Sequence, residues 1–406
     1  MTALLPVDIS RTFGPSATDV TVDLHQHHHD IIHAAVNNQV SKGELVVNLR
    51  DGDGVVGDGR ADDSDALQRA VDGAAKLGAR VFANGTFRIT RTLQLSGNTD
   101  LSDATLVFDG DGTAVLVGTP VGRSFRINVR LPRVVAARKT GRGWDRVAGS
   151  VGVAVQNCYN LDLTVPHVQG FETGLLVVGK GAGVAYCNVT LGHLDNNRTN
   201  LRLTADATGW ANQNNFYGGR LSHNSAEGIR VAGSRHILID QTTAKVNGNS
   251  FWGASLESVD IVEYALDCAG VDNYFMNCRW ENGGTGARVL WRANSVGNVI
   301  AYGPYANGVV ETNEAGSNNI VLTRANARFG SASAGFVRDN TYDLGTSGHR
   351  PRYVRAATGV QTGAFPKKSR PSAKTAGVGT CIFDTTLKRP IWSTGSTWVD
   401  ANGKKV

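Results

Sequence analysis

Acidic and hydroxyl side chains recur at one position of a nine-residue motif, and their residue types suit acid–base chemistry. Four copies of the motif line up: VTLGHLDNN (189–197), FYGGRLSHN (216–224), FWGASLESV (251–259) and FMNCRWENG (275–283). Their seventh positions hold Asp195, Ser222, Glu257 and Glu281. In a stack of parallel strands, side chains in adjacent copies lie about 4.8 Å apart, and those two copies apart lie about 9.6 Å apart.

These separations match those of the paired carboxyl groups in glycosidases. Carboxyl groups about 5 Å apart suit retaining enzymes, and roughly 6.5–9.5 Å suits inverting enzymes. Two like charges this close should also raise the pKa of one carboxyl group, as an acid catalyst requires. Glu257, Glu281 and Asp195 are therefore candidate catalytic residues, and Glu172, Glu227 and Asp240 are further outward-facing candidates.

A second interpretation is that these carboxylates are outward-facing groups neutralised by their neighbours. The fifth positions of the motif hold His193, Arg220 and Arg279, each two residues before a seventh position. A perturbed carboxylate points to a catalytic site only statistically, because structural ion pairs perturb carboxylates too. The three basic side chains are themselves candidate glycan-binding residues.

A basic segment, RLPRVVAARKTGRGWDR (130–146), carries six basic residues against one Asp. Arg142 and Trp144 are candidate glycan contacts, since a guanidinium group and an exposed aromatic ring suit a carboxylated sugar. The alternative is a solvated insertion between structural repeats, because runs of charge are often exposed surface.

The spacing of the motif predicts how these side chains are positioned. The copies start 27, 35 and 24 residues apart, and their first and sixth positions are apolar between mostly polar neighbours. This alternation is typical of a strand with one buried face, and a unit this short must stack on its own copies to bury that face. We therefore predict a parallel β-helix. A recurrent Asn before the first strand of each turn predicts tight corners and a ladder of stacked amides. These positions are Asn160, Asn188, Asn215, Asn273, Asn298 and Asn319.

A capping helix is predicted over residues 63–77. Asp62, Asp63 or Ser64 can cap its first turn, and an apolar face runs from Ala66 to Leu77. A strand (80–82), a turn at Asn84-Gly85 and a second strand (86–90) should follow. Such a helix covers the first strand edges of a stack, which would otherwise favour aggregation.

The chain divides into four predicted parts: a helical leader (1–47), the β-helix (48–345), a linker (346–376) and a C-terminal β tip (377–406). In the leader, His25, His29 and His33 share one helical face, which is either a weak metal-site candidate or a set of polar layers in an attachment helix. In the tip, Phe383, Trp392 and Trp398 are more apolar bulk than about 25 residues bury alone, so we expect contacts with neighbouring chains.

Composition favours a protein of turns and strands and gives little support to other classes. The 406 residues include 49 Gly and only 2 Met, and the net charge of +6 favours anionic partners only weakly. No apolar run is long enough for a membrane span, and the first residues do not resemble a signal peptide. Five Cys residues without a CxxC spacing predict buried free thiols. We expect synthesis in the cytoplasm, and we expect no cofactor, no metal, no nucleic-acid partner and no membrane insertion.

Two stretches of sequence resemble known families. GDGRADDSDALQRA followed by RVFANGTFRIT resembles the opening of the pectate-lyase-like β-helix superfamily, although Ala83-Asn84 stands where that family usually has two prolines. QNNFYGGRLS, the SLE and RWE endings and GVGTCIFDTTLKRPIWSTGSTWVDANGKKV resemble minor tail proteins and tailspikes of tailed bacteriophages. The resemblance covers roughly residues 47–406. It implies a right-handed parallel β-helix, a homotrimer and a place in the virion tail.

From these features we expect a phage tail protein that binds host surface polysaccharide during adsorption. Its partners would be that polysaccharide and other tail or baseplate proteins. Two alternatives stay open. One is a polysaccharide depolymerase, either a glycosidase or a lyase, on the same β-helix, and the other is a purely structural tail component.

Overall fold

The computed structural model describes residues 31, 45–140, 143–144, 147–223, 233–240, 245–258, 262–282, 287–322 and 362–406. The chain forms two compact units, Met1–Asp339 and Asn340–Val406. The candidate metal ligands His25, His29 and His33 lie outside the described residues, as do Arg142 and Glu227.

Three parallel sheets make up the first unit, and we name them A, B and C. Sheet A contains β1 (Val46–Asn48), β2 (Asp58–Asp62), β3 (Arg80–Ile89), β5 (Thr99–Phe108), β8 (Asn128–Arg130), β9 (Arg133–Ala136), β14 (Asp162–Gln169), β17 (Asn188–Asp195), β20 (Asn215–His223), β23 (Ser250–Trp252), β24 (Ser255–Ser258), β26 (Tyr274–Met276), β27 (Arg279–Asn282), β29 (Val299–Ala301) and β31 (Ile320–Leu322). Sheet B contains β4 (Leu93–Leu95), β6 (Thr113–Gly118), β12 (Val151–Gln156), β15 (Thr173–Gly179), β18 (Thr199–Ala205), β21 (Arg235–Ile239), β25 (Tyr264–Cys268), β28 (Ala287–Trp291) and β30 (Val309–Asn313). Sheet C contains β7 (Ser124–Phe125), β13 (Cys158–Tyr159), β16 (Gly183–Ala185), β19 (Trp210–Asn212) and β22 (Val246–Asn247).

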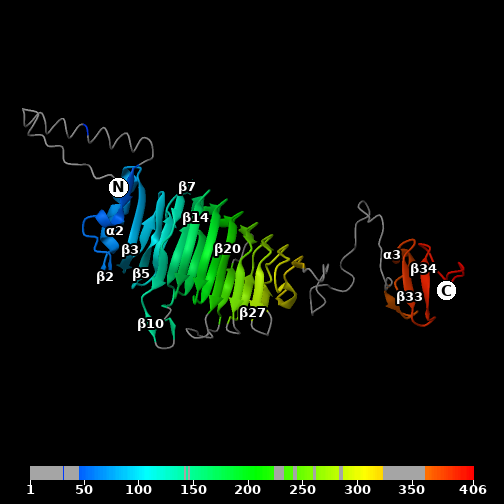
Figure 1. The fold of residues 1–406 in the computed structure, drawn as a ribbon. Coiled ribbons are helices and arrows are strands. Elements are labelled where there is room, and N and C mark those ends of the chain that lie inside the picture. Colours follow the sequence, from blue (N-terminus) through cyan, green and yellow to red (C-terminus); the bar gives the residue numbers. More distant parts are fainter. Residues whose placement is uncertain are drawn as a thin grey trace, which may run out of the picture. The chain divides into compact units, whose positions relative to one another are not determined.

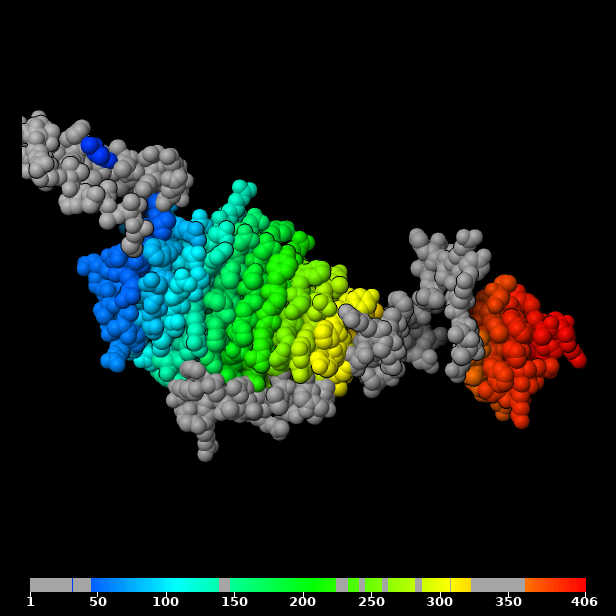
Figure 2. All heavy atoms as spheres, viewed as in Figure 1, coloured from blue at the N-terminus to red at the C-terminus, as the bar shows by residue number. Residues whose placement is uncertain are grey.

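The first unit is a right-handed parallel β-helix, as predicted (Figure 1). In a complete turn the chain passes through sheet B, then sheet C, then sheet A, as in β12, β13 and β14. Each strand therefore pairs with strands about one repeat away in the sequence. The stacked turns appear in Figure 2 as successive bands of colour from blue to yellow. The predicted leader ended at residue 47, but Val46 and Val47 belong to sheet A, because β1 pairs with β3.

The predicted register of the four nonapeptides is confirmed. Their first positions pair in succession through β17, β20, β23 and β26, and their sixth positions pair through β17, β20, β24 and β27. Leu221 and Leu256 are 0% exposed and Trp280 is 1% exposed, so the sixth position faces the core. The rings of Phe216, Phe251 and Phe275 stack with centroids 4.8 and 4.7 Å apart, which is close to the spacing of neighbouring strands.

A sharp corner leads from sheet C to sheet A in successive turns. One residue at each corner has left-handed backbone, with φ between 51° and 67°. These residues are Arg126, Asn160, Tyr186, Gln213, Gly248, Asp272, Gly297 and Asn318. Backbone amides at these corners donate to the next turn, as from Gln213 to the Asn247 carbonyl at 3.1 Å. The corners are therefore in register along the solenoid.

A buried asparagine ladder follows directly after the later corners. Its members are Asn214, Asn249, Asn273, Asn298 and Asn319. Each Nδ2 donates to the Oδ1 of the next member at 2.9, 3.0, 3.0 and 2.8 Å. The ladder was predicted, but half of its predicted members are wrong. Asn160 is itself a corner residue, while Asn188 and Asn215 lie one position further along and bond to each other only weakly, at 3.4 Å.

Helix α2 (Ser64–Lys76) covers the first turns of the solenoid, as predicted. Leu67, Val71 and Ala74 are buried, but Leu77 is 49% exposed, because the helix ends one residue before it. Its start is held by Asp62, which accepts hydrogen bonds from the Ser64 amide at 3.1 Å and the Thr90 hydroxyl at 2.6 Å. Burial opposes ionisation of Asp62, but these hydrogen bonds outweigh it and lower its pKa to about 2.

The turn predicted at Asn84-Gly85 is wrong. Strand β3 runs through both residues from Arg80 to Ile89. The local irregularity is a register shift against β5 between Phe82 and Asn84, followed by left-handed backbone at Gly85 (φ 104°). The glycine therefore serves a bulge within one strand and not a hairpin.

The second unit is a small four-stranded sheet with one short helix. It contains β32 (Ala364–Phe365), α3 (Ala373–Ala376), β33 (Cys381–Asp384), β34 (Arg389–Ser393) and β35 (Trp398–Val399). Residues 364–365 and 373–376, assigned to a linker from the sequence, thus form a strand of this sheet and the helix packed against it. As a result Trp398 is only 5% exposed, and its Nε1 donates to the Pro371 carbonyl at 2.9 Å. The expectation that Trp398 needs a neighbouring chain to become buried is wrong.

Candidate functional site

The fifth and seventh positions of the motif form two parallel columns on the outer face of sheet A. His193, Arg220, Ser255 and Arg279 pair in succession in one column. Asp195, Ser222, Glu257 and Glu281 pair in the other. The structure therefore brings together the predicted catalytic residues and three of the predicted glycan-binding residues.

Glu257 is held by hydrogen bonds from two neighbours. Arg220 Nε donates to its Oε2 at 2.8 Å, and Ser255 Oγ donates to its Oε1 at 2.5 Å. Burial favours the neutral acid, but these hydrogen bonds and the charges of Arg220 and Arg279 outweigh it and lower the pKa of Glu257. The expectation that a nearby like charge would raise its pKa is not met, because Arg220 and Arg279 both lie beside Glu257.

Glu281 is paired with Arg279, whose Nη2 contacts Glu281 Oε2 and whose Nε lies 3.8 Å from Glu257 Oε1. The hydrogen bond to Glu281 raises the pKa of Arg279. The guanidinium also lies over the ring of Tyr305, 5.2 Å from its centroid. Arg279 therefore bridges the two candidate acids and packs on an aromatic ring that is 59% exposed.

Asp195 lies among histidines and a hydroxyl group. His167 Nε2 is 3.5 Å and His193 Nδ1 is 3.8 Å from Asp195 Oδ2, and the Ser222 hydroxyl donates to Oδ1. Burial, followed by the charge of Arg133, lowers the pKa of His167, so this ring is neutral at neutral pH. Asp195 is therefore the acceptor in a polar network.

An exposed aromatic column beside these charges was missed in the sequence analysis. Tyr217 and Trp252 occupy the second position of their nonapeptides and pair in adjacent turns of sheet A. Their side chains are 41% and 44% exposed, and both face outward. The signal was present in the sequence, since the second position of a motif with a buried first position must point to solvent.

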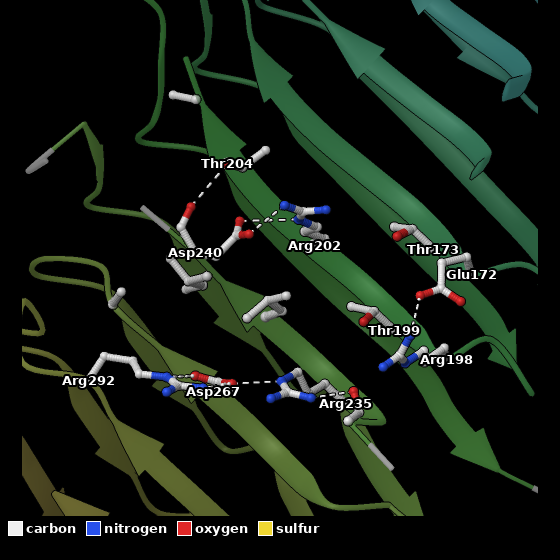
Figure 3. A pocket seen from close by; sticks show the side chains of 15 residues that line it. Glu172, Thr173, Arg198, Thr199, Arg202, Thr204, Arg235, Asp240, Asp267 and Arg292 are labelled. Atoms are coloured by element: carbon white, nitrogen blue, oxygen red, sulfur yellow. Dashed lines mark hydrogen bonds and ion pairs between the residues drawn. The ribbon is translucent and has the colours of Figure 1, made fainter. Parts of the chain in front are cut away.

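Sheet B carries an open hollow of about 700 Å³ on its outer face (Figure 3). Glu172 and Asp240, two of the further candidates, line it and are paired with arginines. Arg198 Nη1 lies 2.8 Å from Glu172 Oε1, and Arg202 makes two hydrogen bonds to Asp240, at 3.2 and 2.5 Å. These acids are therefore neutralised by the arginines beside them.

Asp267 is the most enclosed acid of this hollow, with a side chain 1% exposed. Arg235 Nε lies 2.6 Å from its Oδ2, while Arg292 donates to Oδ1 at 2.7 Å and to Oδ2 at 2.8 Å. The hydrogen bond to Asp267 raises the pKa of Arg292. Because a buried carboxylate needs such partners, the three residues couple consecutive turns of the solenoid. Sequence reasoning missed this cluster, since its members share no column.

The basic segment contributes a small antiparallel pair, β10 (Lys139–Thr140) with β11 (Gly143–Trp144). Trp144 therefore lies in a separate two-stranded sheet and in neither of the two columns. Among the described residues, no group of three or more His, Cys, Asp or Glu is placed to hold a metal ion. No helix in the described part of the chain is long and apolar enough to cross a membrane.

The class of the first unit, a right-handed parallel β-helix, is defined by its own strand pairing. Three solved structures are similar, each at 13% sequence identity. A surface adhesin of Streptococcus pneumoniae, PfbA, matches over 69% of this chain and 79% of the adhesin with a TM-score of 0.49. The Dettilon tailspike protein matches over 70% of this chain and 63% of its own with a TM-score of 0.47, and the ORF18 protein of Geobacillus virus E2 over 97% and 90% with a TM-score of 0.44. The sequence matches no family model and no curated protein.

Proposed function

We propose that this chain is a phage tail protein whose outer face of sheet A binds host surface polysaccharide during adsorption. The observation that carries the proposal is the exposed Tyr217–Trp252 column beside Arg220 and Arg279. Aromatic rings offer flat surfaces for sugar rings, and guanidinium groups bind carboxylate or phosphate groups on a glycan. The sequence resemblance to tail proteins of bacteriophages supports the place in the virion.

Binding to host cells tests the proposal. Purified protein is incubated with host cells and with their extracted envelope polysaccharide, and the bound fraction is measured. Tyr217→Ala combined with Trp252→Ala should reduce binding strongly, and so should Arg220→Ala combined with Arg279→Ala. The matched control is Thr312→Ala on the outer face of sheet B, which should bind like wild type. Wild-type binding by both double variants would overturn this assignment.

The same incubation tests the depolymerase alternative. Glu257→Gln and Glu281→Gln each keep the shape of the side chain and remove its titrating proton. If wild type shortens the glycan chains and these variants do not, the outer face of sheet A is an active site. Cleavage that persists in both single variants and in an Asp195→Asn variant would eliminate these three candidates. Binding to tail proteins but not to cells or glycans would favour the purely structural role.

The proposal includes assembly as a homotrimer in the tail, which the family resemblance implies. Light scattering of the full-length protein should give three times the 43.0 kDa chain mass. A monomer at micromolar concentration would contradict this part of the proposal without affecting the binding face.

A further inference from the structure

A groove runs along the corner between sheets C and A, apart from the charged columns. It has a volume of about 720 Å³ and is open to solvent. Its lining includes Tyr186, Asn188, Gln213, Asn215, Asp272 and Tyr274. These residues come from four turns, so the groove follows the axis of the solenoid and is not confined to one loop.

Two tyrosines mark the groove. Tyr186 is 53% exposed and Tyr274 is 41% exposed, so each presents much of its ring to solvent. Tyr186 is also the left-handed corner residue of its turn, at φ 59°. Asn or Gly fits that conformation with less strain, as at Asn160 and Gly248, but Gln213 and Asp272 also fill corners of this kind. The Tyr186 ring contacts Tyr159, with centroids 6.2 Å apart, and the part of it that stays exposed offers a surface to a ligand.

Between the tyrosines lie amide and carboxylate groups with spare hydrogen-bonding capacity. Asn215 Nδ2 donates to Asn188 Oδ1 at 3.4 Å, and Asn188 Nδ2 donates to Asp162 Oδ1 at 3.0 Å, so each amide keeps one N–H group for another partner. In the described part of the chain, neither the Gln213 amide nor the Asp272 carboxylate makes a side-chain hydrogen bond. Amide donors and a carboxylate acceptor of this kind can hydrogen-bond to the hydroxyl groups of a sugar.

The charge of the groove sets the class of ligand. Its lining contains one carboxylate, Asp272, and no cationic side chain. An acidic sugar would therefore meet a like charge in the groove with no lining cation to offset it. Tyr186 and Asp272 belong to turns three steps apart, which spans about 14 Å of the axis. That length suits several sugar rings of an extended chain and exceeds a single ring.

We propose that the corner groove is a second glycan site, specific for an uncharged oligosaccharide whose rings pack on Tyr186 and Tyr274 and whose hydroxyl groups bond to Asn188, Asn215, Gln213 and Asp272. The inference deepens the proposed function by adding a neutral subsite to a host-binding surface. The groove is tested by a separate measurement, because the probes are free oligosaccharides and not host cells.

The test uses the full-length protein and a panel of uncharged hexasaccharides: β-1,4-glucan, β-1,3-glucan, α-1,4-glucan, mannan and β-1,4-linked N-acetylglucosamine. Binding is followed by saturation-transfer NMR and titration. At least one member should bind wild type, and Tyr186→Asn and Tyr274→Ala should each weaken it about tenfold. Tyr186→Asn removes the ring but suits the left-handed corner, so its fold should persist, which circular dichroism checks.

Arg220→Ala combined with Arg279→Ala serves as the matched control and should bind the hexasaccharide like wild type. If this double variant fails to bind host cells but still binds the hexasaccharide, the result bears on the sheet A face and leaves the groove proposal standing. The inference is overturned if no hexasaccharide binds, as would happen if another copy of the chain covered the groove. It is also overturned if both tyrosine variants bind like wild type, or if a uronate hexasaccharide binds more tightly than every uncharged one through Tyr186.

Discussion

Glu257 and Glu281 stand in register on β24 and β27, and the guanidinium group of Arg279 contacts both of their carboxylates. Two acids that share a proton raise the pKa of one of them, whereas two acids that share a cation both favour the ionised form. The lowered pKa of Glu257 agrees with the second arrangement. This pair is therefore an ion-pair ladder on the surface, as in the second interpretation drawn from the sequence.

The lowered pKa of Glu257 predicts a pH dependence of stability. Its ionised form is stabilised in the folded state, so this contribution is complete above the unfolded pKa of about 4.3 and is lost as pH falls through the lower folded pKa. Glu257→Gln should therefore reduce the melting temperature at pH 7 but flatten its decline on acidification. Melting curves recorded from about pH 7 to pH 3 measure this. Parallel curves for wild type and variant would rule the contribution out.

Leu256 fills the core between Leu221 and Trp280 in neighbouring turns and is 0% exposed. Leu256→Ala should lower the free energy of unfolding by about 2–5 kcal/mol, because truncation leaves a cavity in a packed interior. Chemical denaturation is the measurement, with exposed Thr190→Ala as the control expected to change little. An unchanged unfolding midpoint for Leu256→Ala would contradict the packing.

Asn273 is a central member of the buried ladder and accepts hydrogen bonds from both the backbone and the side-chain amide of Asn249. Asn273→Ala leaves these donors buried without a partner, at a cost of about 1–3 kcal/mol for each. The variant should melt well below wild type, whereas Asn188→Ala on the exposed side of the corner should not. Equal melting temperatures for the two variants would show that burial of the ladder adds no stability.

The five thiols should divide into two classes of reactivity. Cys158, Cys187, Cys268 and Cys278 are buried free thiols, as expected from the sequence, while Cys381 in the second unit is partly exposed. Burial raises the pKa of Cys187 to about 11 and those of Cys268 and Cys278 to about 12, so their reactive thiolates are scarce at neutral pH.

Titration with a thiol reagent under native conditions should label Cys381 alone, and denaturant should release the other four thiols. Cys381→Ser should remove the fast phase. A fast phase that survives this substitution would mean that the solenoid opens around one of its buried cysteines.

The sequence predicts the sheet A register because large apolar residues at the first and sixth motif positions can face only the core. Sheet C gives no such signal, since strands such as Trp210–Asn212 are too short to show a period. The Arg235–Asp267–Arg292 cluster depends on which residues three different turns bring together, and this cannot be read from spacing when the turns differ in length. The sequence predicts a raised pKa in this pair of acids, whereas that of Glu257 is lowered. The reason is related: the sequence places Arg220 and Arg279 nearby but does not show which carboxylate each guanidinium group contacts.

Successive ladder asparagines are separated by 35, 24, 25 and 21 residues, yet their hydrogen bonds differ by no more than 0.2 Å. The geometry of the corner is therefore constant from turn to turn, and the residues that differ in number between turns lie elsewhere in each turn. Insertions or deletions away from this corner need not shift the register of the strands that follow. The solenoid is therefore a scaffold on which loops can change length and sequence while the rest of the molecule keeps its geometry.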